Sequence, residues 1–173
     1  MFKICVLILM IFSLNLIGGE TEKVSFEGKD VILFTLKNDQ SRFFFLSKEF
    51  KKTDKKYFFV TFFTNSCKNC PKEREILKQM AAKYNDLKVI YIAIREGEED
   101  ISKFQEQAKK TMQNEGLDHV LLDVFNSVSK SYYVEDVPRL LIIDTATKKI
   151  VKDLTGYERN LENIYLDLNK SQK

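Results

Sequence analysis

The sequence predicts an α/β fold in which a mixed central sheet is covered by helices on both faces. Three observations support this prediction. Residues 57–64 form an almost continuous run of aromatic and β-branched side chains, which is typical of a strand buried on both faces. Strand-like and helix-like segments then alternate along the chain, as in parallel sheets with helical crossovers. The step Val137-Pro138 introduces a last pair of strand-like runs.

The first predicted element is a β-hairpin. Residues 31–36 and 42–46 are strand-like runs, and the polar residues 37–41 between them have the composition of a turn. Residues 47–56 are expected to form a charged connection. It leads into residues 57–64, which we expect to be the central strand.

A helix is predicted directly after the buried strand, at residues 71–84. Its apolar side chains recur at a spacing that places them on one helical face. These side chains are Ile76, Leu77, Met80, Ala81 and Tyr84.

The remaining elements repeat the alternation and then change it. Strands are predicted at 89–94 and 120–122, and helices at 101–114 and 127–133. The last strands, at 140–143 and 149–154, are joined by a turn at 144–148 and are expected to form an antiparallel hairpin at the sheet edge. Residues 161–168 have the pattern of a closing amphipathic helix.

Length and charge limit the class of protein. A chain of 173 residues with 44% hydrophobic residues and 14 Phe can build one compact domain. The net charge is only +3, and the lysines are scattered along the chain. A protein that binds nucleic acid needs a concentrated basic face, so we expect no nucleic-acid partner. We also expect a monomer.

Residues 1–19 resemble a signal peptide. One cation, Lys3, precedes an apolar run from residue 4 to residue 17, and Gly18-Gly19 follows it. The run is short for a membrane span, yet its end is a poor cleavage site, so an uncleaved N-terminal membrane anchor is the alternative. Either reading predicts an exported protein, periplasmic or anchored to the outer face of the cytoplasmic membrane. Cleavage would remove Cys5 and leave two cysteines, an even number that suits an oxidising compartment.

Those two cysteines form the motif Cys67-Lys68-Asn69-Cys70, which lies between the buried strand and the following helix. The free N–H groups and the positive end of the helix stabilise a thiolate at this position. The spacing lets the second cysteine attack a mixed disulfide formed on the first. We therefore predict a thiol–disulfide oxidoreductase in which Cys67 is the nucleophile and Cys70 the resolving thiol.

Other interpretations of the pair remain open. A structural disulfide across so short a loop would stabilise the fold weakly. A zinc site lacks ligands, because beyond the two cysteines only His119 is a strong candidate. A non-catalytic carrier that binds copper through the cysteines and His119 is the main alternative function. A peroxiredoxin is a further possibility, since Thr64 and Cys67 fit a T-x-x-C spacing.

The chain resembles thioredoxin-fold proteins, and more narrowly the TlpA-like and ResA-like exported thiol–disulfide oxidoreductases. With the elements between them, the similar segments span about residues 31–168. The segments are FTLKNDQSRFFFLSKEF (34–50), FFVTFFTNSCKNCPKEREIL (58–77), VLLDVFNSVSKSYYVEDVPRLLIID (120–144) and LTGY (154–157).

The resemblance implies a thioredoxin-like three-layer α/β/α fold with an N-terminal β-hairpin and an inserted βα-type segment before a cis-proline loop. That loop would be Val137-Pro138, facing the cysteines, with the Val137 backbone pairing with a substrate peptide. The resemblance further implies that Glu73 tunes the thiols and moves protons. A glutamate in the first turn of a helix, interacting favourably with its dipole, is the alternative reading of Glu73.

The resemblance also implies partners. These are protein thiol or disulfide substrates and a membrane electron donor, with no cofactor beyond the Cys67–Cys70 disulfide and no metal. It favours a reductase, and preparing apocytochrome c thiols for haem attachment is one candidate role.

Three residues depart from the family pattern. Ser66 replaces the usual aromatic before the first cysteine, and Thr61 stands where thioredoxin has a buried acid. Arg139 follows the proline, where a small residue is common, and is expected to be either a solvated side chain or a cation beside the substrate groove. These departures suggest a protein that recognises specific partners and does not act as a general thioredoxin.

Overall fold

The computed structural model describes residues 24–170, and within this range the strands form one seven-stranded mixed sheet. The strand order is β2-β1-β5-β4-β3-β6-β7. Strands β3, β4 and β5 run parallel, whereas the β1–β2 and β6–β7 hairpins pair antiparallel with their neighbours. The strands are β1 (Thr35–Asn38), β2 (Phe43–Phe45), β3 (Tyr57–Phe63), β4 (Leu87–Ile94), β5 (Val120–Asp123), β6 (Arg139–Asp144) and β7 (Lys149–Thr155).

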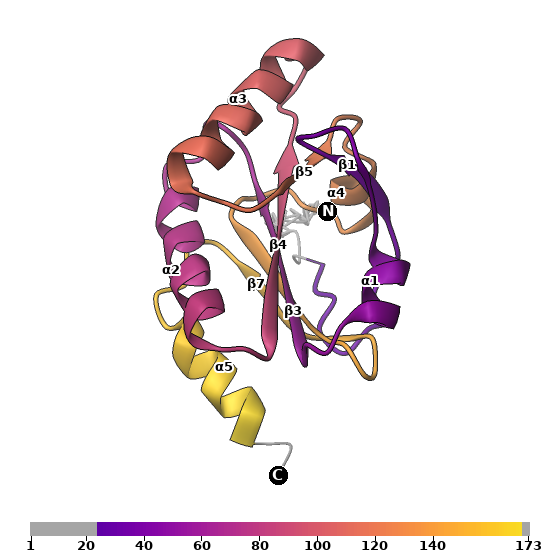
Figure 1. Ribbon diagram of the computed structural model, residues 1–173, viewed down its shortest axis with the longest axis vertical. Helices are drawn as coiled ribbons and strands as arrows, with labels where there is room; N and C mark the ends of the chain where they lie inside the picture. Colours follow the sequence, from indigo (N-terminus) through magenta and orange to yellow (C-terminus); the bar gives the residue numbers. More distant parts are fainter. Residues whose placement is uncertain (1–23, 171–173) are drawn as a thin grey trace, which may run out of the picture.

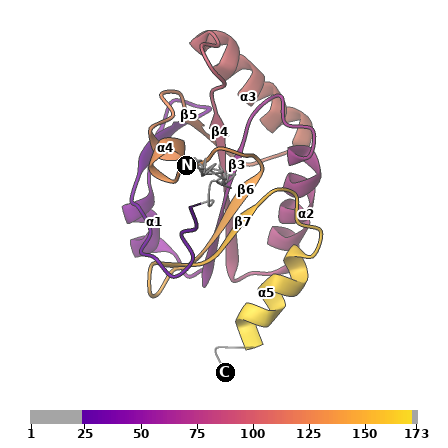
Figure 2. The same cartoon turned by 180° about the vertical axis from the view of Figure 1, so that it is seen from behind.

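Helices cover both faces of the sheet, which gives three layers (Figures 1 and 2). Helices α2, α3 and α5 lie on one face, and the short helices α1 and α4 lie on the other. The helices are α1 (Leu46–Lys52), α2 (Cys70–Lys83), α3 (Ile101–Glu115), α4 (Ser127–Ser131) and α5 (Leu161–Lys170). The predicted three-layer α/β/α fold is confirmed, and β5 with α4 forms the βα segment that precedes the proline loop.

Strand β3 contributes side chains to the core on both faces, and all seven of its residues are buried. Phe58, Val60 and Phe62 pack in the cluster beneath α1 and α4, because alternate strand residues point to opposite faces. Tyr57, Phe59 and Phe63 pack on the side of α2, α3 and α5. The aromatic run therefore supplies both halves of the core, and this anchors the strand end that carries the cysteines.

Three predictions about the elements were wrong in detail. Residues 47–56 are not only a connection, because α1 forms at Leu46–Lys52 around one fully buried side chain, Leu46. The first strand begins at Thr35 and not at residue 31, since the Val31 N–H donates to the Lys148 carbonyl and the Ile32 N–H to the Tyr132 hydroxyl. Strand β3 is not the central strand, because β4 is the fourth of the seven strands and β3 lies next to it, between β4 and β6.

The predicted signal peptide or anchor at residues 1–19 lies outside the described residues. Within residues 24–170, every helix is too short or too polar to cross a membrane.

Candidate active site

Cys67 and Cys70 form a disulfide between the end of β3 and the start of α2, with their Cα atoms 5.5 Å apart. Cys70 is the first residue of α2 and is only 1% exposed, whereas Cys67 is half-buried. The Cys70 backbone N–H donates to the Cys67 Sγ at 3.1 Å, so the helix terminus points at this sulfur as the sequence predicts. The accessible sulfur is thus the one that the helix end stabilises as a thiolate.

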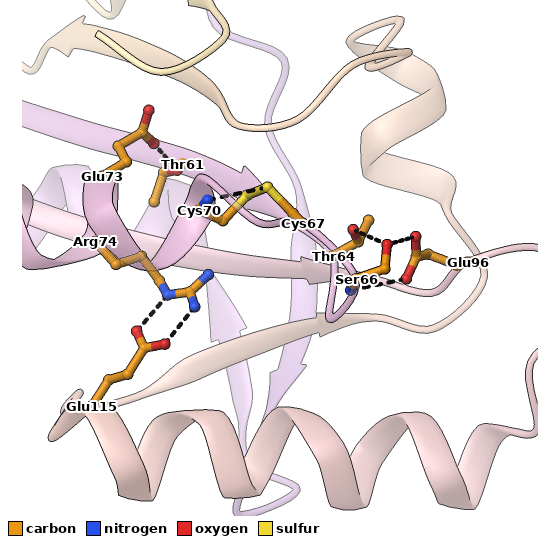
Figure 3. The surroundings of a disulfide bond; sticks show 9 residues. All are labelled: Thr61, Thr64, Ser66, Cys67, Cys70, Glu73, Arg74, Glu96 and Glu115. Atoms are coloured by element: carbon orange, nitrogen blue, oxygen red, sulfur yellow. Dashed lines mark hydrogen bonds and ion pairs between the residues drawn. A yellow bond between two sulfur atoms is a disulfide. The ribbon is translucent and has the colours of Figure 1, made fainter. Parts of the chain in front are cut away.

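Glu73 lies one helical turn after Cys70 and is 1% exposed. One carboxyl oxygen accepts a hydrogen bond from the Thr61 hydroxyl at 2.7 Å, and the other has no hydrogen-bond partner among the described residues (Figure 3). Burial raises the pKa of Glu73 from 4.5 to about 7, although the Thr61 hydrogen bond and the Arg74 charge act in the opposite direction. A carboxyl group with this pKa can both hold and release a proton near neutral pH.

Thr61 is the strand residue that replaces the buried acid of thioredoxin. In this fold it contacts an acid supplied by α2, three residues after the second cysteine. The buried carboxyl group is therefore present but comes from a different element.

Arg74 lies next to Glu73 and is also buried, at 3% exposed. Its guanidinium donates to both carboxylate oxygens of Glu115 at 2.6 and 2.5 Å and lies 4.2 Å from the centre of the Phe63 ring. This ion pair joins the start of α2 to the end of α3 (Figure 3). Sequence reasoning missed it, because Arg74 lies in a charged stretch and its partner is 41 residues away.

The Val137–Pro138 peptide bond is cis, as predicted. Val137 packs in the same apolar cluster as Cys67 and Cys70, so the proline loop faces the disulfide. Between them lies an open groove of about 650 Å³. Its lining includes Cys67, Lys68, Arg95, Glu96, Glu135 and Val137.

Arg139 is neither solvated nor beside the groove, so both expectations for it were wrong. It is 5% exposed, and its guanidinium binds the Asp153 carboxylate at 2.7 and 2.9 Å. It also donates to the backbone carbonyls of Tyr132, Tyr133 and Val24. Two carboxylate oxygens and three carbonyls satisfy this charge in the interior, and Arg139 therefore supports the proline loop from behind.

His119 and the cysteines lie at opposite ends of their parallel strands. His119 precedes β5 and is 3.8 Å from Asp39, whereas the cysteines follow the end of β3. Within residues 24–170 no group of three or more His, Cys, Asp or Glu side chains is arranged to hold a metal ion. The geometry gives no support to a copper site that joins His119 to the cysteines.

Solved structures with the same fold include several thiol–disulfide oxidoreductases. The thioredoxin domain of a thiol-disulfide oxidoreductase from Bacteroides vulgatus is 21% identical, with a TM-score of 0.63, and the match covers 83% of this chain and 96% of that one. The exposed lipoprotein thioredoxin of Streptococcus pneumoniae is 22% identical, with a TM-score of 0.63 and coverage of 80% and 99%. A secreted disulfide oxidoreductase of Mycobacterium tuberculosis, homologous to DsbE of E. coli, is 17% identical, with a TM-score of 0.58 and coverage of 72% and 84%.

At these identities the likeness establishes the fold. No curated protein matches the sequence significantly. The thioredoxin-like family model matches residues 54–151, which is more than half of the chain and includes the cysteine pair and the proline loop. The protein therefore belongs to the thioredoxin-like family.

Proposed function

We propose that the protein is an exported thiol–disulfide oxidoreductase that reduces disulfides in other proteins. The observation that carries this proposal is the asymmetry of the cysteine pair. Cys67 opens onto a groove and receives a helix N–H at its sulfur, whereas Cys70 is buried behind it. A partner can reach only one of the two sulfurs, as a mixed-disulfide mechanism requires.

In the first step the reduced protein attacks its partner. The Cys67 thiolate forms a bond to one sulfur of the partner disulfide, and the partner's S–S bond breaks. The other partner sulfur leaves with the electron pair and takes up a proton. The product is a mixed disulfide between Cys67 and the partner.

In the second step Cys70 loses its proton and attacks Cys67. The Cys67–Cys70 disulfide forms, the bond to the partner breaks, and the partner leaves as a dithiol. The second partner sulfur also leaves with the electron pair and takes up a proton. Two electrons have then passed from the protein to its partner; Cys70 has released one proton, and solvent supplies the other, because Cys67 began as a thiolate. Glu73, buried one turn from Cys70, is the proposed acceptor of the Cys70 proton, because its pKa near 7 lets it take up a proton at neutral pH.

The groove between the cysteines and the proline loop is the proposed binding site for the partner protein. An extended segment lying between the CxxC motif and the proline loop would pair with the Val137 backbone and bring its disulfide to Cys67, since Val137 and Cys67 line the same groove. Polar and charged side chains line the groove together with apolar ones, which suits an extended peptide that presents both backbone groups and side chains.

We further propose that the protein works as a monomer outside the cytoplasm and uses no cofactor besides its disulfide. A membrane dithiol donor would return electrons to the pair. The apolar segment at residues 1–19 supports export, as do the secreted and lipoprotein relatives of the same fold. The family resemblance makes apocytochrome c one candidate substrate.

The test is a trapping experiment on the full-length chain in mild detergent. Cys70→Ser should accumulate a mixed disulfide with a disulfide-containing protein such as insulin, because the resolving thiol is missing. Cys67→Ser, the matched control, should accumulate none, and the unaltered protein should catalyse insulin reduction by dithiothreitol. If Cys70→Ser traps nothing and the unaltered protein does not accelerate reduction, the proposal is wrong.

A further inference from the structure

Ser66, the residue directly before Cys67, is held by a carboxylate from another loop. The Ser66 hydroxyl donates to one oxygen of Glu96, and the Ser66 backbone N–H donates to the other at 3.3 Å. Glu96 belongs to the loop between β4 and α3, 30 residues further along the chain. Figure 3 shows the disulfide between two carboxylates, with Glu73 on one side and Glu96 on the other.

The hydrogen bonds within the segment that Glu96 holds are long, and one of them joins the Thr64 and Ser66 hydroxyls at 3.4 Å. Its turn is closed by a long hydrogen bond of 3.4 Å from the Cys67 N–H to the Thr64 carbonyl. Both polar atoms of the Asn65 side chain lack a hydrogen-bond partner among the described residues. The two Glu96 contacts fix the segment against the β4–α3 loop.

We propose that Glu96 is a positioning residue that fixes Ser66 and holds a negative charge beside Cys67, making the reduced pair a stronger electron donor. The inference rests on the proposed function and adds to it a residue that tunes the reduction potential of the cysteine pair. Glu96 also lines the groove with Cys67, so its carboxylate and the thiolate face the same open space, although the Glu96 side chain is itself exposed.

The physical reason lies in the charge that reduction creates. When the disulfide accepts two electrons, Cys67 becomes a thiolate, and a nearby carboxylate raises the free energy of that state. A less stable reduced form passes its electrons on more readily. The helix terminus acts in the opposite direction, as do Lys68 and Arg95, two cations that line the same groove. Lys68 and Glu96 are both exposed, but Lys68 is on a flexible stem. Glu96 is held in one place by two hydrogen bonds, so its effect on Cys67 persists.

The experiment measures the equilibrium between the protein disulfide and dithiothreitol, which yields the protein dithiol and cyclic oxidised dithiothreitol. The full-length chain is equilibrated at pH 7 over a series of dithiothreitol ratios, and its thiols are then trapped and counted. Glu96→Gln keeps the shape of the side chain and an acceptor for the Ser66 hydroxyl but removes the charge. It should raise the reduced-to-oxidised ratio by about threefold to tenfold, where tenfold corresponds to about 30 mV.

Glu98→Gln is the matched control, because Glu98 is an exposed carboxylate of the same loop that does not line the groove. It should leave the ratio unchanged. The Glu96→Gln effect should shrink in 1 M NaCl, where the screening length is only about 3 Å, whereas a loosened loop would be insensitive to salt.

An unchanged ratio in Glu96→Gln would overturn the inference, as would an equal effect in Glu98→Gln or a shift that salt leaves intact. Each of these results is compatible with an active oxidoreductase. Failure of the unaltered protein to exchange with dithiothreitol would instead count against the proposed function itself.

Discussion

The Glu73 carboxyl group is deeply buried and accepts one hydrogen bond, from an uncharged hydroxyl. These two features determine its pKa. The Thr61 hydroxyl stabilises one oxygen of the carboxylate, while the loss of hydration acts on the whole group and is the larger effect. The outcome is a pKa of about 7, so the two protonation states are similarly populated near neutral pH.

Glu73→Gln should slow the resolving step by roughly a hundredfold, because glutamine cannot accept the Cys70 proton. In the unaltered protein the rate of that step should rise with pH and level off above about 7, as Glu73 becomes ionised. The glutamine variant should lack this inflection. Stopped-flow release of a chromophoric thiol from the Cys67 mixed disulfide, followed from pH 5 to 9, measures both effects.

Thr61→Val serves as the companion variant in the same assay. Loss of the hydroxyl bond removes an interaction that lowers the pKa of Glu73, so the inflection should move to higher pH. A glutamine variant that keeps both the rate and the inflection would show that Glu73 is only a buried helix residue.

Residues whose role depends on neighbouring positions could be predicted from the sequence. Cys67 and Cys70 fall into this class, because the strand before them and the helix after them define their setting. Glu96 and the Arg74–Glu115 pair do not, since each joins segments 30 or more positions apart and lies among other charged residues. The Ser66–Glu96 contact becomes visible only when β3 and β4 pair in parallel and bring the loops after them together. The Arg74–Glu115 pair becomes visible only when α2 and α3 lie on the same face of the sheet.

The proline loop depends on a buried ion pair between its following strand and β7. Side chains of Arg139 and Asp153 are 6% and 2% exposed, and the guanidinium also binds two carbonyls of the segment before the loop. Both ends of the loop are thereby attached to one side chain.

Arg139→Met should lower the free energy of unfolding by about 3–5 kcal/mol, because it leaves the Asp153 carboxylate buried without its partner. Replacing both partners, Arg139→Met with Asp153→Leu, should recover part of this loss. Urea unfolding of the oxidised forms of the unaltered protein, the single variant and the double variant measures both changes in the free energy of unfolding.

Strand β7 also carries an exposed ion pair, between Lys152 and Glu27, which serves as the comparison for the buried Arg139–Asp153 pair. Glu27→Gln should cost at most about 1 kcal/mol, since water screens that pair. Equal costs for Arg139→Met and Glu27→Gln would mean that Arg139 is not a structural support.

Helices and strands could be predicted from the sequence where buried apolar residues recur regularly along them. Strand β3 and helices α2 and α5 have clear apolar patterns, and each was predicted within two residues of its bounds. Helix α1 has one fully buried side chain in seven residues, so the sequence offered no period to detect. Residues 31–34 have strand-like composition, but their backbone groups bond to a turn and to a tyrosine hydroxyl instead of a sheet ladder.

At the scale of the whole molecule, the buried carboxyl group links stability to pH. Between pH 4.5 and about 7 the folded protein retains the Glu73 proton that the unfolded chain has lost. Since the folded state then binds more protons, the free energy of unfolding falls as pH rises through this window and becomes level above it.

Glu73→Gln should remove this fall, which amounts to about 3 kcal/mol. Urea unfolding of the oxidised protein at pH 5 and pH 8 measures it, with Glu75→Gln as the control because Glu75 is an exposed carboxylate of the same helix. If Glu73→Gln loses as much stability as the unaltered protein between the two pH values, the fall has another origin.

The buried acid of this protein is carried by the same helix as Cys70, the proposed resolving thiol. Cys70 and Glu73 belong to consecutive turns of α2, whose start is fixed to α3 by Arg74. They therefore move as one rigid body, and their separation does not depend on how the loops around the groove adjust to a partner. Under the proposed mechanism, recognition and proton transfer are therefore separable traits, and changes to the groove should alter which protein is reduced without disturbing proton transfer.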